Sequence, residues 1–360
     1  MTQDLELTAP TTRPVSAQHA FDAGALAAYL RAKGVRFDGE LHIAQFAGGQ
    51  SNPTYLVGAG DQRYVLRRKP PGALLPSAHA VDREYKVMHA LADSAVPVPK
   101  VLMMCDDPGV IGTAFFLMEY VDGRVFWDAT LPGVAPAQRA ALYDELNRVV
   151  AALHQVDYPA RGLQDFGRPG NYLARQIDRW TRQYRAAETE PMEAMERLIE
   201  WLPKHVPASD ETTVVHGDYR IDNVIFHPSE PRMLAVLDWE LSTLGHPLAD
   251  FAYHVMTWRV TADEFRGILG KDLRALGIPE EAAYVEAYCR RTGRESIADW
   301  DYYLAFNMFR MAAILQGILA RAIQGNATSP EALATGRRAR PMAEAGWRQV
   351  EQLLARAPGI

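Results

Sequence analysis

Two short apolar segments, each followed at once by acidic or amide side chains, constrain this chain more than any other feature. The first, Val214-Val215, leads into His216-Gly217-Asp218-Tyr219-Arg220-Ile221-Asp222-Asn223. The second, Met233–Leu237, leads into Asp238-Trp239-Glu240. Asp218 and Asn223 are five positions apart, and Asp238 follows Asp218 by twenty. A base and two oxygen ligands for a metal, delivered in this order at strand ends, are typical of phosphoryl-transfer sites.

Each of these side chains has a chemical role in such a site. Asp218 is predicted to accept the proton of a substrate hydroxyl. Asn223 and Asp238 offer oxygen atoms to Mg²⁺, a hard cation that prefers oxygen ligands. Glu240 shares a face with Asp238 if the strand continues, which would make it a support for the metal or a ligand of a second one. Arg220 is expected to neutralise a phosphate or a carboxylate of the loop.

Composition narrows the class of protein. The chain has 360 residues, enough for two domains, with 48% hydrophobic and 23% charged residues, as in soluble globular proteins. A net charge of -6 does not favour binding to nucleic acid or to an anionic membrane. Cys105 and Cys289 are far apart and lack CxxC spacing, so neither a disulfide framework nor a zinc site is expected. No signal peptide and no run of ~18 apolar residues is recognised, which predicts a cytoplasmic protein.

The order of strand-like and helix-like segments predicts two lobes. Residues 1–17 are polar and contain prolines, so they are expected to form a flexible leader. Residues 18–121 hold most of the alternating, strand-like segments. Residues 122–360 are almost entirely helical in pattern, apart from the strands at the site. The prediction is an α+β fold with a small β-rich N-terminal lobe and a larger, mainly helical C-terminal lobe.

A glycine-rich turn lies between two strand-like segments of the first part. Leu41–Phe46 leads into Ala47-Gly48-Gly49-Gln50-Ser51-Asn52-Pro53, and Thr54–Val57 follows. Such a turn can lay backbone N–H groups over phosphates, so Ser51 and Asn52 are candidate nucleotide contacts. It does not match GxxxxGK[ST], and an ordinary hairpin turn remains an alternative.

A cation and a carboxylate of the first part are predicted to meet. In the strand Tyr64–Lys69, Arg67 and Lys69 share one face, and one of them would reach the phosphates. In the helix predicted for Ser77–Leu91, Glu84 lies on the apolar edge, where a carboxylate needs a cation, and Arg67 is the natural partner. Lys69, beside two prolines, is expected to be solvated, and a surface-exposed Glu84 remains an alternative.

The chain resembles the aminoglycoside phosphotransferase family, which has a protein-kinase-like fold. The stretch His216–Asn223 matches the family's HGDxxxxN signature and is similar to the H-R-D-x-x-x-x-N loop of protein kinases. Asp238 stands where the family carries its metal-binding aspartate. The resemblance covers roughly residues 35–330. Three further segments match: Tyr64–Arg67 with the V-A-I-K strand, Glu84 with the αC glutamate, and Phe116–Tyr120 with the approach to the hinge. The last match implies that Glu119 and Val121 contact the nucleotide.

This resemblance implies ATP and Mg²⁺ as cofactors and a small-molecule hydroxyl as phosphate acceptor. It also implies that His216 supports the catalytic loop and that Asp250 anchors the loop by accepting backbone N–H bonds. Two departures matter. Arg67 replaces the usual lysine, and its planar fork binds phosphate differently. Gly217 replaces the arginine of the protein-kinase loop and no A-P-E segment is present, which argues against a protein substrate.

Within the family, the chain is similar to the kinase-like domain of the acyl-CoA dehydrogenase 10/11 branch. The similarity rests on Val65–Gly72, Leu74–His79 and Asp238–Gly245. It implies a hydroxyacyl-CoA-type acceptor in preference to an aminoglycoside, for which several convergent carboxylates would be needed. Basic groups for a CoA-linked substrate are offered by Arg259, Arg310 and Arg321.

Two other functions remain as alternatives at this level. A nucleotide-binding pseudokinase module with lost catalysis is kept open by Arg67. A metallohydrolase built on His216, Asp218 and Asp238 would need more histidine ligands nearby than the sequence offers. The phosphate acceptor, the preference for ATP or GTP and the oligomeric state are not determined by the sequence.

Overall fold

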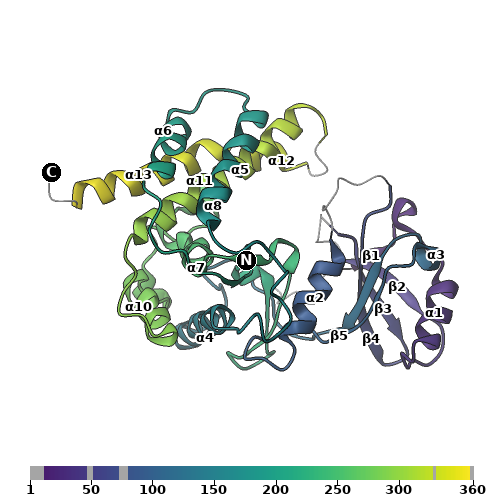
Figure 1. Ribbon diagram of the computed structural model, residues 1–360. Coiled ribbons are helices and arrows are strands. Elements are labelled where there is room, and N and C mark those ends of the chain that lie inside the picture. The colour runs from purple at the N-terminus through teal and green to yellow at the C-terminus, as the bar shows by residue number, and fades with distance from the viewer. Residues whose placement is uncertain (1–11, 47–51, 73–79, 327–329, 357–360) are drawn as a thin grey trace, which may run out of the picture. The chain divides into compact units, whose positions relative to one another are not determined.

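The computed structural model describes residues 12–46, 52–72, 80–326 and 330–356 (Figure 1). The chain divides into two compact units, which are described separately here. The first unit comprises the chain up to Phe126 together with Pro159–Phe166 and Ile221–Ser242. The second comprises Trp127–Tyr158, Gly167–Arg220 and the chain from Thr243.

The first unit is built on an antiparallel sheet with the strand order β1-β2-β3-β4-β6-β5. Its strands are β1 (Thr12–Pro14), β2 (His42–Phe46), β3 (Thr54–Ala59), β4 (Gln62–Arg68), β5 (Val101–Cys105) and β6 (Phe115–Glu119). Strand β1 lies within the predicted leader 1–17, so that part of the leader is an edge strand paired with β2.

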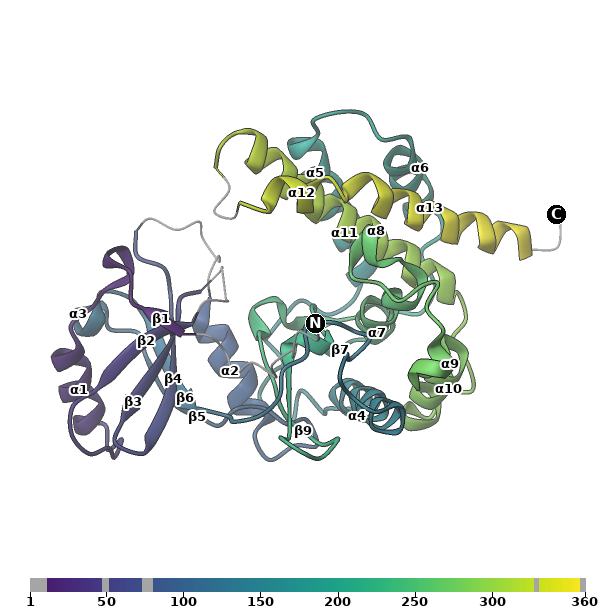
Figure 2. The same cartoon turned by 180° about the vertical axis from the view of Figure 1, so that it is seen from behind.

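Helices cover both faces of this sheet. Figures 1 and 2 show α1 (Ala23–Ala32) and α3 (Pro108–Ile111) against one face and α2 (Val81–Leu91) against the other. Because side chains alternate along a strand, Leu66 and Phe115 pack in the core beneath α1 and α3. Arg67, the next residue in β4, therefore points to the face of α2. The helix predicted for Ser77–Leu91 begins at Val81 in the structure, and Ser77 lies outside the described residues.

A small two-stranded ribbon completes the first unit. It pairs β8 (Val224–Phe226) with β9 (Met233–Val236), flanked by the 3-10 turns η3 (Ile221–Asn223) and η4 (Trp239–Leu241). Backbone hydrogen bonds join Phe226 to Arg124 in both directions. Gly123 must be glycine here, because a Cβ would lie 2.3 Å from the carbonyl oxygen of Phe226. The first unit thus continues past the predicted boundary near residue 121 as far as Phe126, and Arg124 in this extension pairs with the ribbon.

Two arginines connect the segment Pro159–Phe166 of the first unit to helix α2 and the residues that follow it. Arg161 donates to the carbonyl oxygens of Ala90 and Ala92, both at 2.9 Å. Arg83 donates to the carbonyl oxygens of Phe166 at 2.6 Å and Ser242 at 3.3 Å. These tertiary bonds explain why segments distant in sequence belong to the first unit. The assignment of domains as 18–121 and 122–360 stays a prediction.

The second unit is mainly helical. Its central helix, α11, contacts α5, α7, α12 and α13, and Figure 1 shows α13 running beside it. A short antiparallel pair, β7 with β10, lies beside α4 and α7. The elements are α4 (Pro136–His154), α5 (Tyr172–Ala187), α6 (Glu193–Trp201), η2 (Leu202–Lys204), β7 (Thr213–Val215), β10 (Thr243–Gly245), α7 (Pro247–Val255), η5 (Met256–Arg259), α8 (Ala262–Phe265), α9 (Leu273–Leu276), α10 (Glu281–Thr292), α11 (Trp300–Ile323), α12 (Ala332–Gly336) and α13 (Ala339–Arg356).

Within the part of the chain that the structure describes, helix α11 is long and apolar enough, by length and composition alone, to cross a membrane. Polar residues such as Asn307 and Arg310 interrupt it, so it is not an unbroken run of about 18 apolar residues. However, 83% of its most apolar window is buried inside the protein. Helix α11 is therefore apolar on nearly all sides because neighbouring helices surround it, as expected for a core helix.

Candidate active site

In the first unit, the guanidinium group of Arg67 joins three carboxylates. Its Nε lies 2.8 and 3.0 Å from the two carboxylate oxygens of Glu84. Its Nη2 lies 2.8 Å from Oδ1 of Asp238 and 3.4 Å from Oε2 of Glu240. We call these four residues the Arg67 cluster. One cation of strand β4 thus faces one acid of helix α2 and two acids of the turn after β9.

Burial makes these contacts necessary. Glu84 is 1% exposed and Arg67 9% exposed, so the alternative of a surface-exposed Glu84 is wrong. The amide nitrogen of Asn52 also donates to Glu84, at 2.8 Å, and Asn52 is fully buried. Asn52 is therefore a partner of Glu84 in this structure, and its predicted contact with a nucleotide stays a prediction. A buried carboxylate with two donors meets the rule that buried charges are paired and hydrogen-bonded.

The pKa values of the cluster reflect its burial and the charges within it. Burial raises the pKa of Glu84 to about 7, although the charge of Arg67 opposes the shift. Burial also acts to lower the pKa of Arg67, but Glu84, Asp238 and Glu240 together outweigh it and raise the pKa. Arg67 consequently stays charged, and the cluster carries more negative than positive charge whenever its carboxylates are ionised.

The backbone turns sharply at Asp238, which corrects the expected path to Glu240. Strand β9 ends at Val236, and Asp238 has a φ of 62°, in the left-handed region that aspartate tolerates better than most residues. Trp239–Leu241 then form η4, and the indole N–H of Trp239 donates to the carbonyl oxygen of Val236 at 2.9 Å. The strand does not continue, so it is this turn that brings Glu240 to Arg67.

Asn223 and Asp238 lie at the same end of the β8–β9 ribbon. Val224 pairs with Val236, and the N–H of Leu237 donates to the carbonyl oxygen of Asn223 at 2.8 Å. An amide and a carboxylate at one ribbon end fit Mg²⁺, which typically takes few protein ligands and completes its shell with phosphate oxygens and water. The described residues contain no group of three or more His, Cys, Asp or Glu suited to a metal, so a protein-only cage is not present among them.

The other predicted nucleotide contacts of the first unit are placed only in part. Ser51 lies outside the described residues. Glu119 ends β6 with an exposed side chain, and Val121 follows in an irregular segment. Lys69 lies 3.5 Å from Asp82 near the surface, as expected for a solvated residue, whereas Arg67 is the cation directed at the acids.

In the second unit, Asp250 holds the backbone of the predicted catalytic loop. Its two carboxylate oxygens accept hydrogen bonds from the N–H groups of His216 and Gly217, each at 2.8 Å. Asp250 lies in the first turn of α7, whose N-cap is His246. Gly217 has a φ of 84°, a left-handed conformation that favours glycine, so the loop can present both N–H groups to one carboxylate. The structure thus shows the contacts that the anchor role of Asp250 requires.

A buried chain of hydrogen bonds through His154 to Tyr288 supports Asp250. Nε2 of His154 lies 3.1 Å from its carboxylate, and Nδ1 of His154 lies 2.7 Å from the hydroxyl of Tyr288. Burial alone would raise the pKa of Asp250, but His154 and His216 outweigh it and lower the pKa below its ordinary value. Asp250 is therefore an ionised anchor, and His154 supports it through hydrogen bonds.

Asp218 is oriented by neighbours in its own loop and on α7. Its N–H donates to Nδ1 of His216 at 3.1 Å, consistent with the supporting role predicted for His216. Its Oδ1 lies 2.5 Å from the hydroxyl of Tyr253 on α7 and 3.1 Å from Nε of Arg220. Arg220 therefore meets a loop carboxylate, one of the two partners predicted for it. Arg310 of α11 donates to the carbonyl oxygen of Gly217 at 2.7 Å.

Tyr253 was missed by sequence reasoning, although one signal was available. It follows Asp250 by three positions in the same helix, and such residues share a helix face. Of the three arginines considered for a CoA-linked substrate, only Arg310 contacts the loop among the described interactions. Arg259 is paired with Glu281 and Asp301, and Arg321 lies exposed in the last turn of α11.

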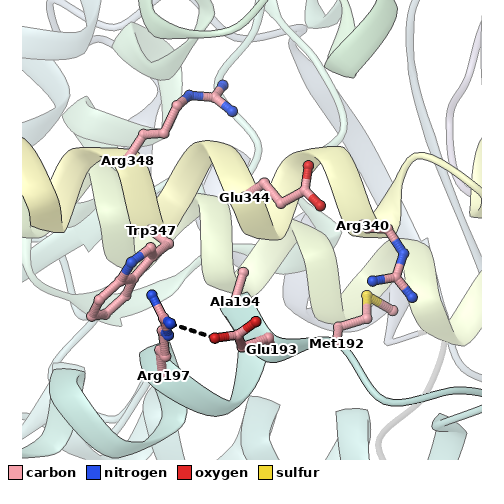
Figure 3. Close-up of a pocket in the computed structure, with 8 residues that line it drawn as sticks. All are labelled: Met192, Glu193, Ala194, Arg197, Arg340, Glu344, Trp347 and Arg348. Atoms are coloured by element: carbon pink, nitrogen blue, oxygen red, sulfur yellow. Dashed lines mark hydrogen bonds and ion pairs between the residues drawn. The ribbon is translucent and has the colours of Figure 1, made fainter.

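A separate cavity of about 300 Å³ lies where α6 approaches α13 in the second unit. Figure 3 shows that Arg197, Arg340, Arg348 and Trp347 surround it. Each arginine already faces a glutamate: Arg197 pairs with Glu193, Arg340 with Glu190 at 2.8 Å, and Arg348 with Glu264 at 2.5 Å. With its charges balanced and no residue shared with the loop, the cavity supports no functional assignment.

Residues 42–306 match the model of the phosphotransferase enzyme family. The chain belongs to this family. Both the family recognised from His216–Asn223 and the kinase-like fold expected from it are thereby confirmed. Among the described residues of this phosphotransferase, the architecture is the predicted small antiparallel sheet with a larger helical part.

Curated relatives of this phosphotransferase are much longer proteins. It is 48% identical over 346 residues to acyl-CoA dehydrogenase family member 10 of Mus musculus, covering 95% of this chain and 32% of the relative. It is 43% identical over 337 residues to acyl-CoA dehydrogenase family member 11 of Homo sapiens, covering 91% of this chain and 43% of the relative. The chain thus spans less than half the length of these relatives, and it is similar to the branch that the sequence indicated.

Solved structures agree on the fold of the phosphotransferase. A crystal structure from Ralstonia eutropha, described as a candidate aminoglycoside phosphotransferase, is 55% identical with a TM-score of 0.86, covering 92% of this chain and 99% of that one. The ternary complex of aminoglycoside phosphotransferase APH(4)-Ia with AMP-PNP and hygromycin B is 17% identical with a TM-score of 0.58, covering 91% of this chain and 99% of that one. At that identity the second comparison shows the fold alone.

Proposed function

We propose that this phosphotransferase transfers the γ-phosphate of ATP to a hydroxyl group of a small molecule. The observation that carries the proposal is the Arg67 cluster: a buried Arg–Glu pair extended to Asp238, which lies with Asn223 at one end of a ribbon. Family membership supports the transfer of phosphate, and the complex of the related enzyme with AMP-PNP supports a nucleotide donor.

The residues of the chain have distinct roles in this reaction. Arg67, fixed by Glu84, would bind the nucleotide phosphates through its planar donor fork. Asn223 and Asp238 would hold Mg²⁺, which when bound neutralises the charge on the phosphate oxygens. Asp218, oriented by Tyr253 and Arg220, would accept the hydroxyl proton of the acceptor. Glu119 and Val121 would contact the nucleotide base.

We propose a hydroxyacyl-CoA-type acceptor in preference to an aminoglycoside. The side chains that contact Asp218 or its loop include the cations Arg220 and Arg310 and the aromatic Tyr253. Cations beside the base attract an anionic acceptor and oppose a polycationic one. The names of the relatives, which include acyl-CoA dehydrogenases, support the same class of acceptor.

One observation favours a second function, nucleotide binding without turnover. Arg67 stands in place of the family's usual lysine and is ion-paired with Asp238, a predicted metal ligand. If that pair persisted with nucleotide bound, it would compete with the metal for Asp238. A pseudokinase module of this kind would bind ATP and release no ADP with any acceptor.

The test is a coupled ADP-release screen that compares hydroxyacyl-CoAs, aminoglycosides, choline-like alcohols and sugars. The proposal expects Mg²⁺-dependent ADP release with a hydroxyacyl-CoA and a product heavier by one phosphoryl group in mass spectrometry. Turnover with aminoglycosides alone would refute the proposed acceptor class. ATP binding with no ADP release across the whole panel would refute the kinase assignment in favour of the pseudokinase. Comparison of ATP with GTP in the same assay would establish the donor.

A further inference from the structure

Helix α7 contacts the catalytic loop at two levels. Asp250 accepts hydrogen bonds from the loop backbone, and Tyr253, three residues later, contacts the side chain of Asp218. Tyr253 is 3% exposed, and its hydroxyl lies 2.5 Å from Oδ1 of Asp218. The phenol O–H of Tyr253 therefore donates a hydrogen bond to the carboxylate of Asp218. A single rigid helix thus holds both the main chain and the carboxylate of the predicted base.

Tyr253 can only be the donor in this pair. Burial and the charge of Asp218 both raise the pKa of Tyr253, so the phenol keeps its proton. Because Oδ1 also faces Nε of Arg220 at 3.1 Å, this oxygen of Asp218 is held from two directions. This oxygen is thereby held relative to both α7 and the loop.

We propose that Tyr253 is a positioning residue for Asp218, holding its carboxylate in place to accept the proton of the acceptor hydroxyl. The inference rests on the proposed function and adds to it. As the hydroxyl oxygen forms its bond to the γ-phosphorus, its proton passes to Asp218 and the bond to the β–γ bridging oxygen breaks, with the electron pair leaving on ADP. Tyr253 keeps its own proton throughout and acts only through Asp218.

Arg310 supports Tyr253 from the neighbouring helix. Its guanidinium carbon lies 5.1 Å from the centre of the Tyr253 ring and 5.8 Å from that of Trp180. The same side chain donates to the carbonyl oxygen of Gly217 at 2.7 Å. Asn307, also on α11, donates to the carbonyl oxygen of Ala249 at 2.8 Å and so joins α11 to α7. These contacts give the tyrosine ring a defined place from which to reach the base.

Tyr253→Phe tests the inference, since it removes one oxygen and keeps the ring. A lost hydrogen bond to a charged group predicts a fall in kcat of roughly 10- to 100-fold, with the KM values for ATP and acceptor unchanged within about twofold. Tyr302→Phe is the matched control: its hydroxyl is also buried and donates to a carbonyl oxygen, that of Leu202, at 3.0 Å. The control should keep its kcat. An unchanged kcat in Tyr253→Phe would overturn the inference, as would a raised acceptor KM with kcat intact, which would indicate direct substrate contact.

A second measurement does not depend on turnover. Thermal unfolding of Tyr253→Phe, Asp218→Ala and the double variant should be non-additive: the double variant's Tm shift should differ from the sum of the single shifts. Additive shifts would mean that the two side chains do not interact, which overturns the inference even if the enzyme is active. If the Tm shifts of the variants were non-additive but the wild-type protein released no ADP, the two side chains would interact without catalysis. That result would refute the proposed function and, with it, the catalytic role of the pair.

Discussion

Asp218 in the second unit and Asp238 in the first are both partly exposed, with side chains 19% and 37% accessible, yet their surroundings differ. Asp218 sits on a loop whose backbone is fixed by Asp250 and whose carboxylate meets Tyr253 and Arg220. Asp238 shares one guanidinium with Glu84 and Glu240. The loop region has a partner for each acid, whereas the Arg67 cluster has one cation for three acids.

This difference teaches how each region would work. A carboxylate with a dedicated set of donors is already in its working geometry, which suits a base that must meet a hydroxyl at short range. In the Arg67 cluster one guanidinium is shared by three carboxylates, and burial raises the pKa of Glu84 to about 7, with smaller contributions from the neighbouring acids. Such a cluster is suited to gain a divalent cation. We therefore expect substitutions in the loop to affect turnover and substitutions in the cluster to affect ligand binding.

The largest expected effect is on turnover. Asp218→Ala should lower kcat by roughly 10²- to 10⁴-fold, because the hydroxyl loses its proton acceptor. The affinity for ATP should stay nearly intact, since Asp218 is not among the residues proposed to bind it. Steady-state kinetics and nucleotide titration calorimetry measure the two effects. An active Asp218→Ala enzyme would refute the assignment of this residue as the base.

On the other side of the comparison, Asp238→Ala should remove Mg²⁺-dependent nucleotide binding. The carboxylate that would bind the metal is lost, and calorimetry with and without Mg²⁺ should then give the same weak affinity. Asp82→Ala is a suitable control, because Asp82 is an exposed carboxylate of the same unit that lies near Lys69. Unchanged Mg²⁺-dependent binding in Asp238→Ala would exclude Asp238 as a ligand.

Asp250→Asn should destabilise the protein by about 2–4 kcal/mol at neutral pH. Each carboxylate oxygen of Asp250 accepts from one loop N–H group, whereas an asparagine amide has only one oxygen that can accept. The pKa of Asp250 is lowered in the folded state, so its contribution to stability is present above about pH 4 and is lost as pH falls through the lowered pKa. The gap between wild type and variant should therefore shrink below pH 4. Denaturant unfolding at several pH values measures it, with Asp263→Asn, an exposed position, as control. A gap that is independent of pH would contradict the ionised anchor.

The smallest expected effect sharpens the comparison at Arg67. Arg67→Lys keeps one charge but loses the fork that reaches Glu84, Asp238 and Glu240 together, so the KM for ATP should change by about threefold to tenfold while kcat changes little. Arg67→Ala should raise the KM for ATP further. A normal KM for ATP in Arg67→Ala would move the phosphate contact to another cation, with Lys69 as the candidate.

Local sequence patterns predicted the elements and the order of the site residues well. Strand alternation placed Arg67 on one face of β4, and burial of Glu84 at a helix edge required that cation as its partner. That pairing depends on periodicity and on the cost of burying charge, both of which are visible in a sequence. The anchor role of Asp250 was instead implied by the family resemblance, and the two hydrogen bonds that such an anchor accepts from the loop are present.

Other features had no local signal. Glu240 reaches Arg67 through a left-handed turn at Asp238, not along a strand, because the turn is stabilised by Trp239 and its contact with Val236. Helix α11 is apolar like a membrane span, and only the packing of the helices around it identifies it as a core helix. Tyr253 reaches Asp218 because Asp250 first sets how the loop lies on α7.

By itself, the sequence determined the family, the fold class and the chemistry available at positions 67, 84, 218, 223, 238 and 250, because spacing and residue type fix which groups a chain can offer. The tertiary structure alone decided which donor meets which carboxylate: Tyr253 and Arg220 for Asp218, and one shared Arg67 for three acids. Hydrogen bonds and ion pairs act over a few ångströms, so they depend on contacts between segments far apart in the chain.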